Sequence, residues 1–162
     1  MRVISTTNTM LLRYNSKPII PPVANRYLGA PTHPIRPKIA HMYATRDTNT
    51  LWWRVAISQL QMFKRVVRSW CSRRARIAFQ EALKHQGYDK LGRPLPSAAS
   101  NRSEGLTGSI ELVVRPTIRD QSFQTVQRDA DHLLESLLQY KASPRGRTSK
   151  RSETHSASAS KL

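Results

Sequence analysis

The sequence has few acidic residues, one cysteine and no long apolar run. It contains 10 Asp and Glu against 27 Lys and Arg, so its net charge is +17. The single Cys71 excludes an intramolecular disulfide and a cysteine-rich zinc site. No apolar run approaches the ~20 residues that cross a bilayer, because Arg and Lys interrupt the longest candidate, residues 51–83. This composition is typical of a protein that binds a negatively charged partner.

Residue patterns for catalysis or metal binding are equally scarce. The five histidines show no metal-ligand spacing with one another or with Cys71. Asp129 and Asp131 point to different sides of a predicted helix, so they do not converge as paired carboxylates. No glycine loop precedes a helix in the way that phosphate-binding loops do. We therefore expect a non-enzymatic protein with no metal and no cofactor.

Residues 1–47 form the first predicted segment, a basic arm that is rich in proline from residue 18. No acid occurs before Asp47, and Ser, Thr and Asn are frequent, which is the composition of a mitochondrial presequence. Ile4, Thr7, Leu11 and Tyr14 would line one side of a helix that Pro18 ends. The alternative is a disordered basic arm.

Residues 48–143 are predicted to form a small α+β domain that begins with one long helix over 49–87. Apolar residues recur at three- and four-residue spacing. They are Leu51, Trp52, Val55, Ala56, Leu60, Phe63, Val67, Trp70, Ala75, Ala78, Phe79, Ala82 and Leu83. Thr48 or Asn49 can cap the start of this helix, and Gly87 can end it.

The rest of this domain reads as a loop over 88–108, a strand over 109–115 and a closing amphipathic helix over 120–141. Ile110, Leu112 and Val114 alternate with the other strand residues, and the apolar stripe from Phe123 to Leu138 is expected to pack on them and on the long helix. A single strand leaves its backbone groups unpaired. Either a second strand lies in the N-terminal region, for instance around residues 18–23, or a protein partner completes the sheet.

Residues 144–162 are a basic, Ser-rich tail that is predicted to be disordered, because it lacks large hydrophobic residues before its end. The last three residues, Ser160, Lys161 and Leu162, match a peroxisomal address. That match competes with the presequence-like N-terminus.

The basic residues of the predicted long helix are the candidate polyanion-binding site. They are Arg54, Lys64, Arg65, Arg68, Arg73, Arg74 and Arg76. Guanidinium groups bind phosphate oxygens bidentately, and no acid balances them between Thr48 and Gln80. Trp52, Phe63 and Trp70 are expected on the apolar side of the helix. RNA is the natural partner, and an anionic membrane surface is the alternative.

Three hypotheses follow. The first is a structural or accessory subunit that binds RNA in an organellar, most plausibly mitochondrial, ribonucleoprotein, with a protein partner covering the long helix. The second is a peroxisomal protein, and the third is a membrane-surface adaptor. The general makeup resembles that of small basic subunits of organellar ribosomes, although the likeness covers no specific motif.

Overall fold

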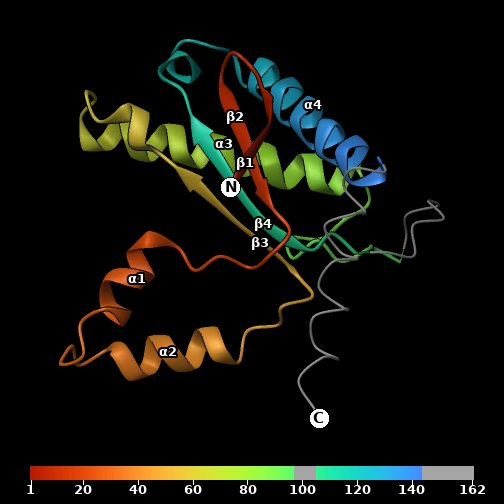
Figure 1. The fold of residues 1–162 in the computed structure, drawn as a ribbon. Helices are drawn as coiled ribbons and strands as arrows, with labels where there is room; N and C mark the ends of the chain where they lie inside the picture. The colour runs from red at the N-terminus through yellow and green to blue at the C-terminus, as the bar shows by residue number, and fades with distance from the viewer. Residues whose placement is uncertain (97–104, 144–162) are drawn as a thin grey trace.

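The computed structural model describes residues 1–96 and 105–143, which form a four-stranded sheet with two long helices packed on one face (Figure 1). The strands are β1 (Arg2–Thr6), β2 (Met10–Asn15), β3 (Leu51–Ala56) and β4 (Gly108–Val114). Their order in the sheet is β1-β2-β4-β3. The α+β class is confirmed, whereas the prediction of one strand is wrong. β2 and β3 flank β4 within the chain, so the sheet does not require a partner to supply them.

The first 15 residues form an antiparallel hairpin, not a disordered arm or a helix. β1 pairs with β2, and β2 pairs with β4, also antiparallel. Met10, Leu12 and Tyr14 are buried and alternate with less buried neighbours, which is the period of two that a strand requires. The Thr7 amide and hydroxyl both donate to the Met10 carbonyl, at 2.8 and 3.0 Å, and close the turn.

The predicted helix over 49–87 divides into a strand and a shorter helix. Its first part is β3, which runs parallel to β4. The 3-10 turn η1 (Ser58–Leu60) follows, and the helix α3 covers only Arg65–His85. Trp53 and Val55 of β3 pack against the core beneath the helices. The strand β3, the helix α3 and the parallel strand β4 therefore form a β-α-β unit.

The closing helix α4 (Phe123–Ala142) packs against α3 and against β1 and β2. It agrees with the predicted bounds within three residues, and β4 agrees with the predicted strand within one. The Ser122 hydroxyl accepts a hydrogen bond from the Thr125 amide, at 3.2 Å, and caps the helix. The predicted apolar face is buried at Leu133, Leu134 and Leu137, but Phe123 lies at the exposed end of the helix.

Two short helices, α1 (Pro22–Leu28) and α2 (Arg36–Ala44), lie off the sheet between β2 and β3 (Figure 1). They contact each other, and the rings of Tyr27 and His33 meet edge to face at 4.9 Å. No residue of α2 is buried. This proline-rich part of the predicted arm therefore contains two short helices, but it adds almost nothing to the core.

The predicted disordered tail over 144–162, with its Ser160, Lys161 and Leu162 address, lies outside the described residues, and so does part of the predicted loop, residues 97–104. Within the described ranges, no helix is both long enough and apolar enough to cross a bilayer.

Candidate nucleic-acid interface

The seven candidate residues fall on two elements, β3 and α3, and on the residue before α3. Arg54 lies on β3, Lys64 immediately precedes α3, and the other five, Arg65, Arg68, Arg73, Arg74 and Arg76, lie on α3. The sequence therefore identified a real basic helix, but the seven side chains do not form one surface.

Arg54 points to the face of the sheet opposite α3. Side chains alternate along a strand, so the core position of Val55 places Arg54 on the other face. There it lies across from Glu111 of β4 in the strand register and forms an ion pair with it. Arg13 of β2 approaches the same carboxylate at 3.2 Å. Arg54 is thus separated by the thickness of the sheet from the other candidates.

Arg74 and Arg68 make internal contacts. The Arg74 guanidinium donates to the carbonyls of Ile118 and Gln121, at 2.9 and 2.7 Å, and lies 4.5 Å from the centre of the Trp70 ring. These bonds hold the 3-10 turn η2 (Pro116–Arg119) against α3. The Arg68 side chain donates to the Gln61 amide oxygen at 3.1 Å. Both arginines therefore have a structural role.

The remaining four residues, Lys64, Arg65, Arg73 and Arg76, are exposed and form what we call the α3 basic face. None of them forms an ion pair with an acid of the described residues. From Arg65 to Arg76 the helix rises ~16 Å. The face is a short, rigid row of cations.

Apolar side chains share this outward side of α3. On α3, Val66, Trp70 and Ile77 are 80%, 46% and 42% exposed, and Met62, in the turn before the helix, is 78% exposed. Trp70 is expected on the apolar side of the long helix, but it does not lie on the buried side of α3, which is lined by smaller residues such as Cys71, Ala75 and Ala78. An exposed indole beside guanidinium groups is a feature that the hydrophobic spacing could not reveal.

Seven of the eight acidic side chains of the described residues have a partner away from the α3 basic face, and the eighth, Glu135, is exposed on α4. The seven are Asp47 with Arg93, Glu81 with Lys84, Asp89 in its own turn, Glu111 with Arg13 and Arg54, Asp120 with Arg119, Asp129 with Thr9, and Asp131 with His85. The hydrogen bond from Arg119 lowers the pKa of the Asp120 carboxyl, and Lys84 similarly lowers the pKa of Glu81. The α3 basic face therefore has no ion-pair partner among the acids of residues 1–96 and 105–143.

Groups that could support other chemistry are dispersed. No set of three His, Cys, Asp or Glu side chains within residues 1–96 and 105–143 could hold a metal ion. Cys71 is fully buried, and this burial raises the pKa of its thiol. A buried thiol that stays protonated at neutral pH is a poor nucleophile.

No protein-family model matches the chain, and neither a curated protein nor a solved structure is significantly similar to it. The α3 basic face and the rest of the geometry therefore carry the functional argument by themselves.

Proposed function

We propose that this protein is a non-enzymatic RNA-binding subunit, and that the α3 basic face binds backbone phosphates. The observation that carries the proposal is the row of Lys64, Arg65, Arg73 and Arg76, which is exposed and lacks a carboxylate partner in the described part of the chain. Arginine suits phosphate because its planar fork donates two parallel hydrogen bonds.

Single-stranded or looped RNA fits this surface better than a duplex. Trp70 lies among the cations and is 46% exposed, so an unstacked base can pack on its ring. Bases in an A-form duplex are already stacked and do not offer their faces to a side chain. We therefore place the RNA strand along α3, with phosphates at the arginines and at least one base at Trp70.

The test is the salt dependence of binding to a labelled single-stranded RNA, measured by fluorescence anisotropy. The triple variant Arg65→Gln, Arg73→Gln, Arg76→Gln removes three phosphate contacts. For single strands, each phosphate contact contributes about −0.7 to the slope of log K against log salt concentration. Losing three contacts should therefore make this slope shallower by about 2.

The matched control removes the same charge elsewhere, through Lys38→Gln, Lys90→Gln and Arg128→Gln. These three residues are exposed and lie outside α3. The control should keep the wild-type slope. An equal loss in both variants would mean that net charge, and not the α3 basic face, drives binding, and the proposal would be wrong.

A membrane surface is the second candidate, because Val66, Trp70 and Ile77 give α3 an exposed apolar strip beside its cations, and Met62 is exposed just before the helix. Basic residues attract anionic lipids, and an indole can sit among the head groups. Flotation with vesicles that contain phosphatidylserine distinguishes the two candidates. Binding to vesicles without binding to RNA would favour the membrane.

The compartment remains a proposal as well: mitochondrial from the acid-poor N-terminus, or peroxisomal from Ser160, Lys161 and Leu162. We propose that residues 2–15 are retained in either case, since β1 and β2 are half of the sheet. Localisation with a tag at each end in turn tests both addresses, and the mass of the purified organellar protein tests retention.

A further inference from the structure

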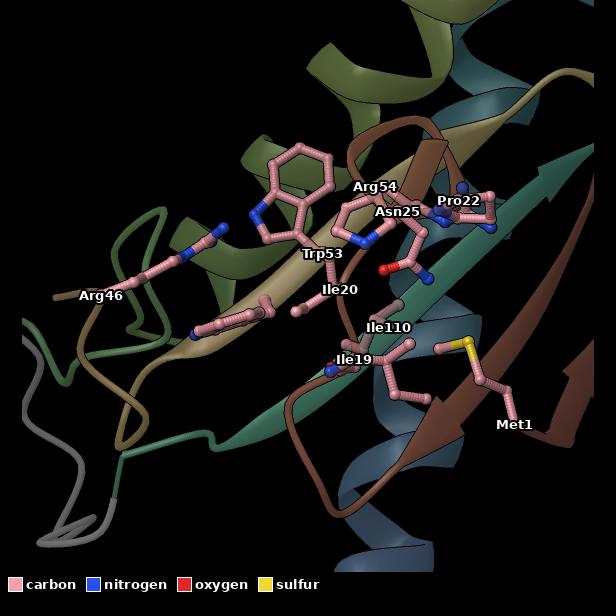
Figure 2. A pocket seen from close by; sticks show the side chains of 12 residues that line it. Met1, Ile19, Ile20, Pro22, Asn25, Arg46, Trp53, Arg54 and Ile110 are labelled. Atoms are coloured by element: carbon pink, nitrogen blue, oxygen red, sulfur yellow. The ribbon is translucent and has the colours of Figure 1, made fainter. Parts of the chain in front are cut away.

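A pocket of about 200 Å³ lies on the face of the sheet opposite α3, beneath the segment that leads into α1 (Figure 2). Twelve residues line it. They are Met1, Ile19, Ile20, Pro21, Pro22, Asn25, Arg46, Trp52, Trp53, Arg54, Ser109 and Ile110. The side chain of Trp53 packs on Phe79 on the helical side, with ring centres 5.0 Å apart, so the floor here is formed by Trp52 and the strand backbone.

The apolar wall of the pocket is fixed to the sheet. The Ile19 amide donates to the hydroxyl of Ser109, a buried residue of β4, at 2.7 Å. This bond holds residues 19–22 over the sheet. Pro21 and Pro22 then start α1 with restricted backbone angles, and Asn25, on the next turn, lines the pocket. The wall is therefore preformed.

The floor is the ring of Trp52, which has a fixed orientation and is only 6% exposed, with Arg46 covering it. The Trp52 indole N–H donates to the Asp47 carbonyl at 3.0 Å, and the Tyr43 ring lies 5.8 Å from it, centre to centre. The Arg46 guanidinium lies 4.2 Å from the centre of the same ring. A planar cation stacked on an indole makes a platform that suits another planar ring.

The charge around the pocket is positive. Arg46 and Arg54 line it, and no acidic side chain of residues 1–96 and 105–143 does. Glu111 forms ion pairs with both Arg54 and Arg13. Two guanidinium groups therefore share one carboxylate, and these three side chains together keep a net charge of +1. The carboxylate of Asp47, next to Arg46 in the chain, pairs with Arg93 at 3.4 Å.

We infer that this pocket binds one nucleotide, with the base against the Arg46 guanidinium that covers the Trp52 ring and the phosphate at Arg54. Asn25 offers an amide donor and acceptor to the edge of the base. The volume lies below the ~300–1,000 Å³ typical of sites for drug-sized ligands, so it suits a single base with its phosphate at the open rim.

This inference rests on the proposed function, because an RNA strand bound to the protein can supply such an unstacked nucleotide. A free mononucleotide has the same chemistry, and both sources are tested below. Figure 2 shows Arg46 at one side of the pocket and Met1 at the other, with Ile19 and Ile20 between them.

The experiment follows the indole N–H signals of ¹⁵N-labelled full-length protein by NMR during titration with AMP. The Trp52 signal, assigned through Trp52→Phe, should shift at a lower AMP concentration than the Trp70 signal. Adenosine, which lacks the phosphate, should bind about tenfold or more weakly, because it loses a charge-assisted hydrogen bond.

Two variants test the site itself. Arg46→Gln removes the cation of the platform, and Asn25→Trp places an indole in the mouth of the pocket from an exposed position on α1. Each should weaken AMP binding about tenfold or more without changing the circular dichroism spectrum. The α3 triple variant should bind AMP as wild type does. A 5′-phosphorylated RNA that shifts Trp52 at far lower concentration than AMP would identify the strand as the source.

Each remaining outcome has a distinct meaning. The nucleotide inference is wrong if AMP leaves the Trp52 signal unshifted, or if benzoate shifts that signal as much as AMP does. The proposal for the α3 basic face is tested separately, by the salt dependence of RNA binding. AMP binding that is normal in both pocket variants also overturns it. AMP binding at Trp52 together with an unchanged RNA slope in the α3 triple variant would refute the proposed function and leave a free nucleotide as the ligand.

Discussion

Replacing Glu111 with glutamine removes the charge that holds two arginines together on the sheet. The Glu111 side chain is only 8% exposed, whereas Arg13 and Arg54 are 43% and 35% exposed. Losing one partner of a buried pair costs about 3–5 kcal/mol, and an exposed pair contributes about 1 kcal/mol or less. Since the carboxylate is buried but the arginines can still reach water, we expect Glu111→Gln to lower the free energy of unfolding by about 2–3 kcal/mol.

The assay is urea and thermal unfolding followed by circular dichroism. For a chain of this size the expected loss lowers Tm by about 5–10 °C. Glu135→Gln, at an exposed position on α4, is the control and should change stability by less than about 0.5 kcal/mol. If Glu111→Gln is as mild as the control, the carboxylate does not hold the strands together. The same variant leaves Arg54 without its counterion, so AMP should bind the pocket more tightly.

Three further predictions concern the fold. Gly108→Ala should lower the free energy of unfolding in urea by about 2 kcal/mol or more, because φ is 101° and the new Cβ would lie 2.5 Å from the Asn15 carbonyl oxygen. Gly29→Ala, in ordinary helical backbone, is the control and should be nearly neutral. Equal effects of the two substitutions would contradict this prediction. Cys71 should react with iodoacetamide at least about a hundredfold more slowly in the folded chain than in urea. Burial raises the pKa of the Cys71 thiol above its ordinary value of 9.0, so the stability that the protonated thiol contributes should be lost as pH rises past about 9. The urea midpoint of the wild type should therefore fall relative to that of Cys71→Ala in this pH range, and a constant difference between the two midpoints would contradict the prediction. Leu134→Asp should abolish helical circular dichroism beyond α4, since it buries a charge at a fully enclosed position; an unchanged spectrum would remove Leu134 from the core.

The C-terminal half of the fold was predictable because its signals agree with one another. Ile110, Leu112 and Val114 alternate in a short segment that Pro116 follows, and Leu133 and Leu137 repeat with helical spacing after the Ser122 cap. Only one secondary structure satisfies each pattern. The structure places both elements within three residues of their predicted bounds.

The N-terminal half was mispredicted because short apolar runs fit two periods at once. Leu51, Trp52 and Val55 match a helix, while Leu51, Trp53 and Val55 match a strand, and six residues cannot separate the two. Pairing with β4, whose Gly108 lies opposite Leu51, decides for the strand. The hairpin is a similar case, since Ile4, Leu11 and Tyr14 have helical spacing but Met10, Leu12 and Tyr14 have that of a strand.

The candidate site was predictable in composition but not in geometry. An acid-free stretch correctly marked α3 as basic. Which cations belong to the α3 basic face depends on tertiary neighbours: Arg74 is held by two carbonyls of η2, and Arg54 lies on the other face of the sheet, beside Glu111. The pocket combines Arg46 and Trp52 with residues 19–22, and only the fold brings those segments together.

The strand order carries a consequence for how the chain reaches its native state. β4, the strand that both β2 and β3 require, is the last of the four in sequence. A growing chain therefore holds a hairpin and a strand-helix unit that cannot join until residue 114 has emerged, and each keeps an unpaired edge until then. Long sequence separation between paired strands slows folding, because the entropy of loop closure is lost before the strand contacts that compensate for it can form. Ribosome-stalled chains that end before β4 should therefore bind chaperones and resist proteolysis poorly, and protection should appear in one step once β4 and α4 are complete.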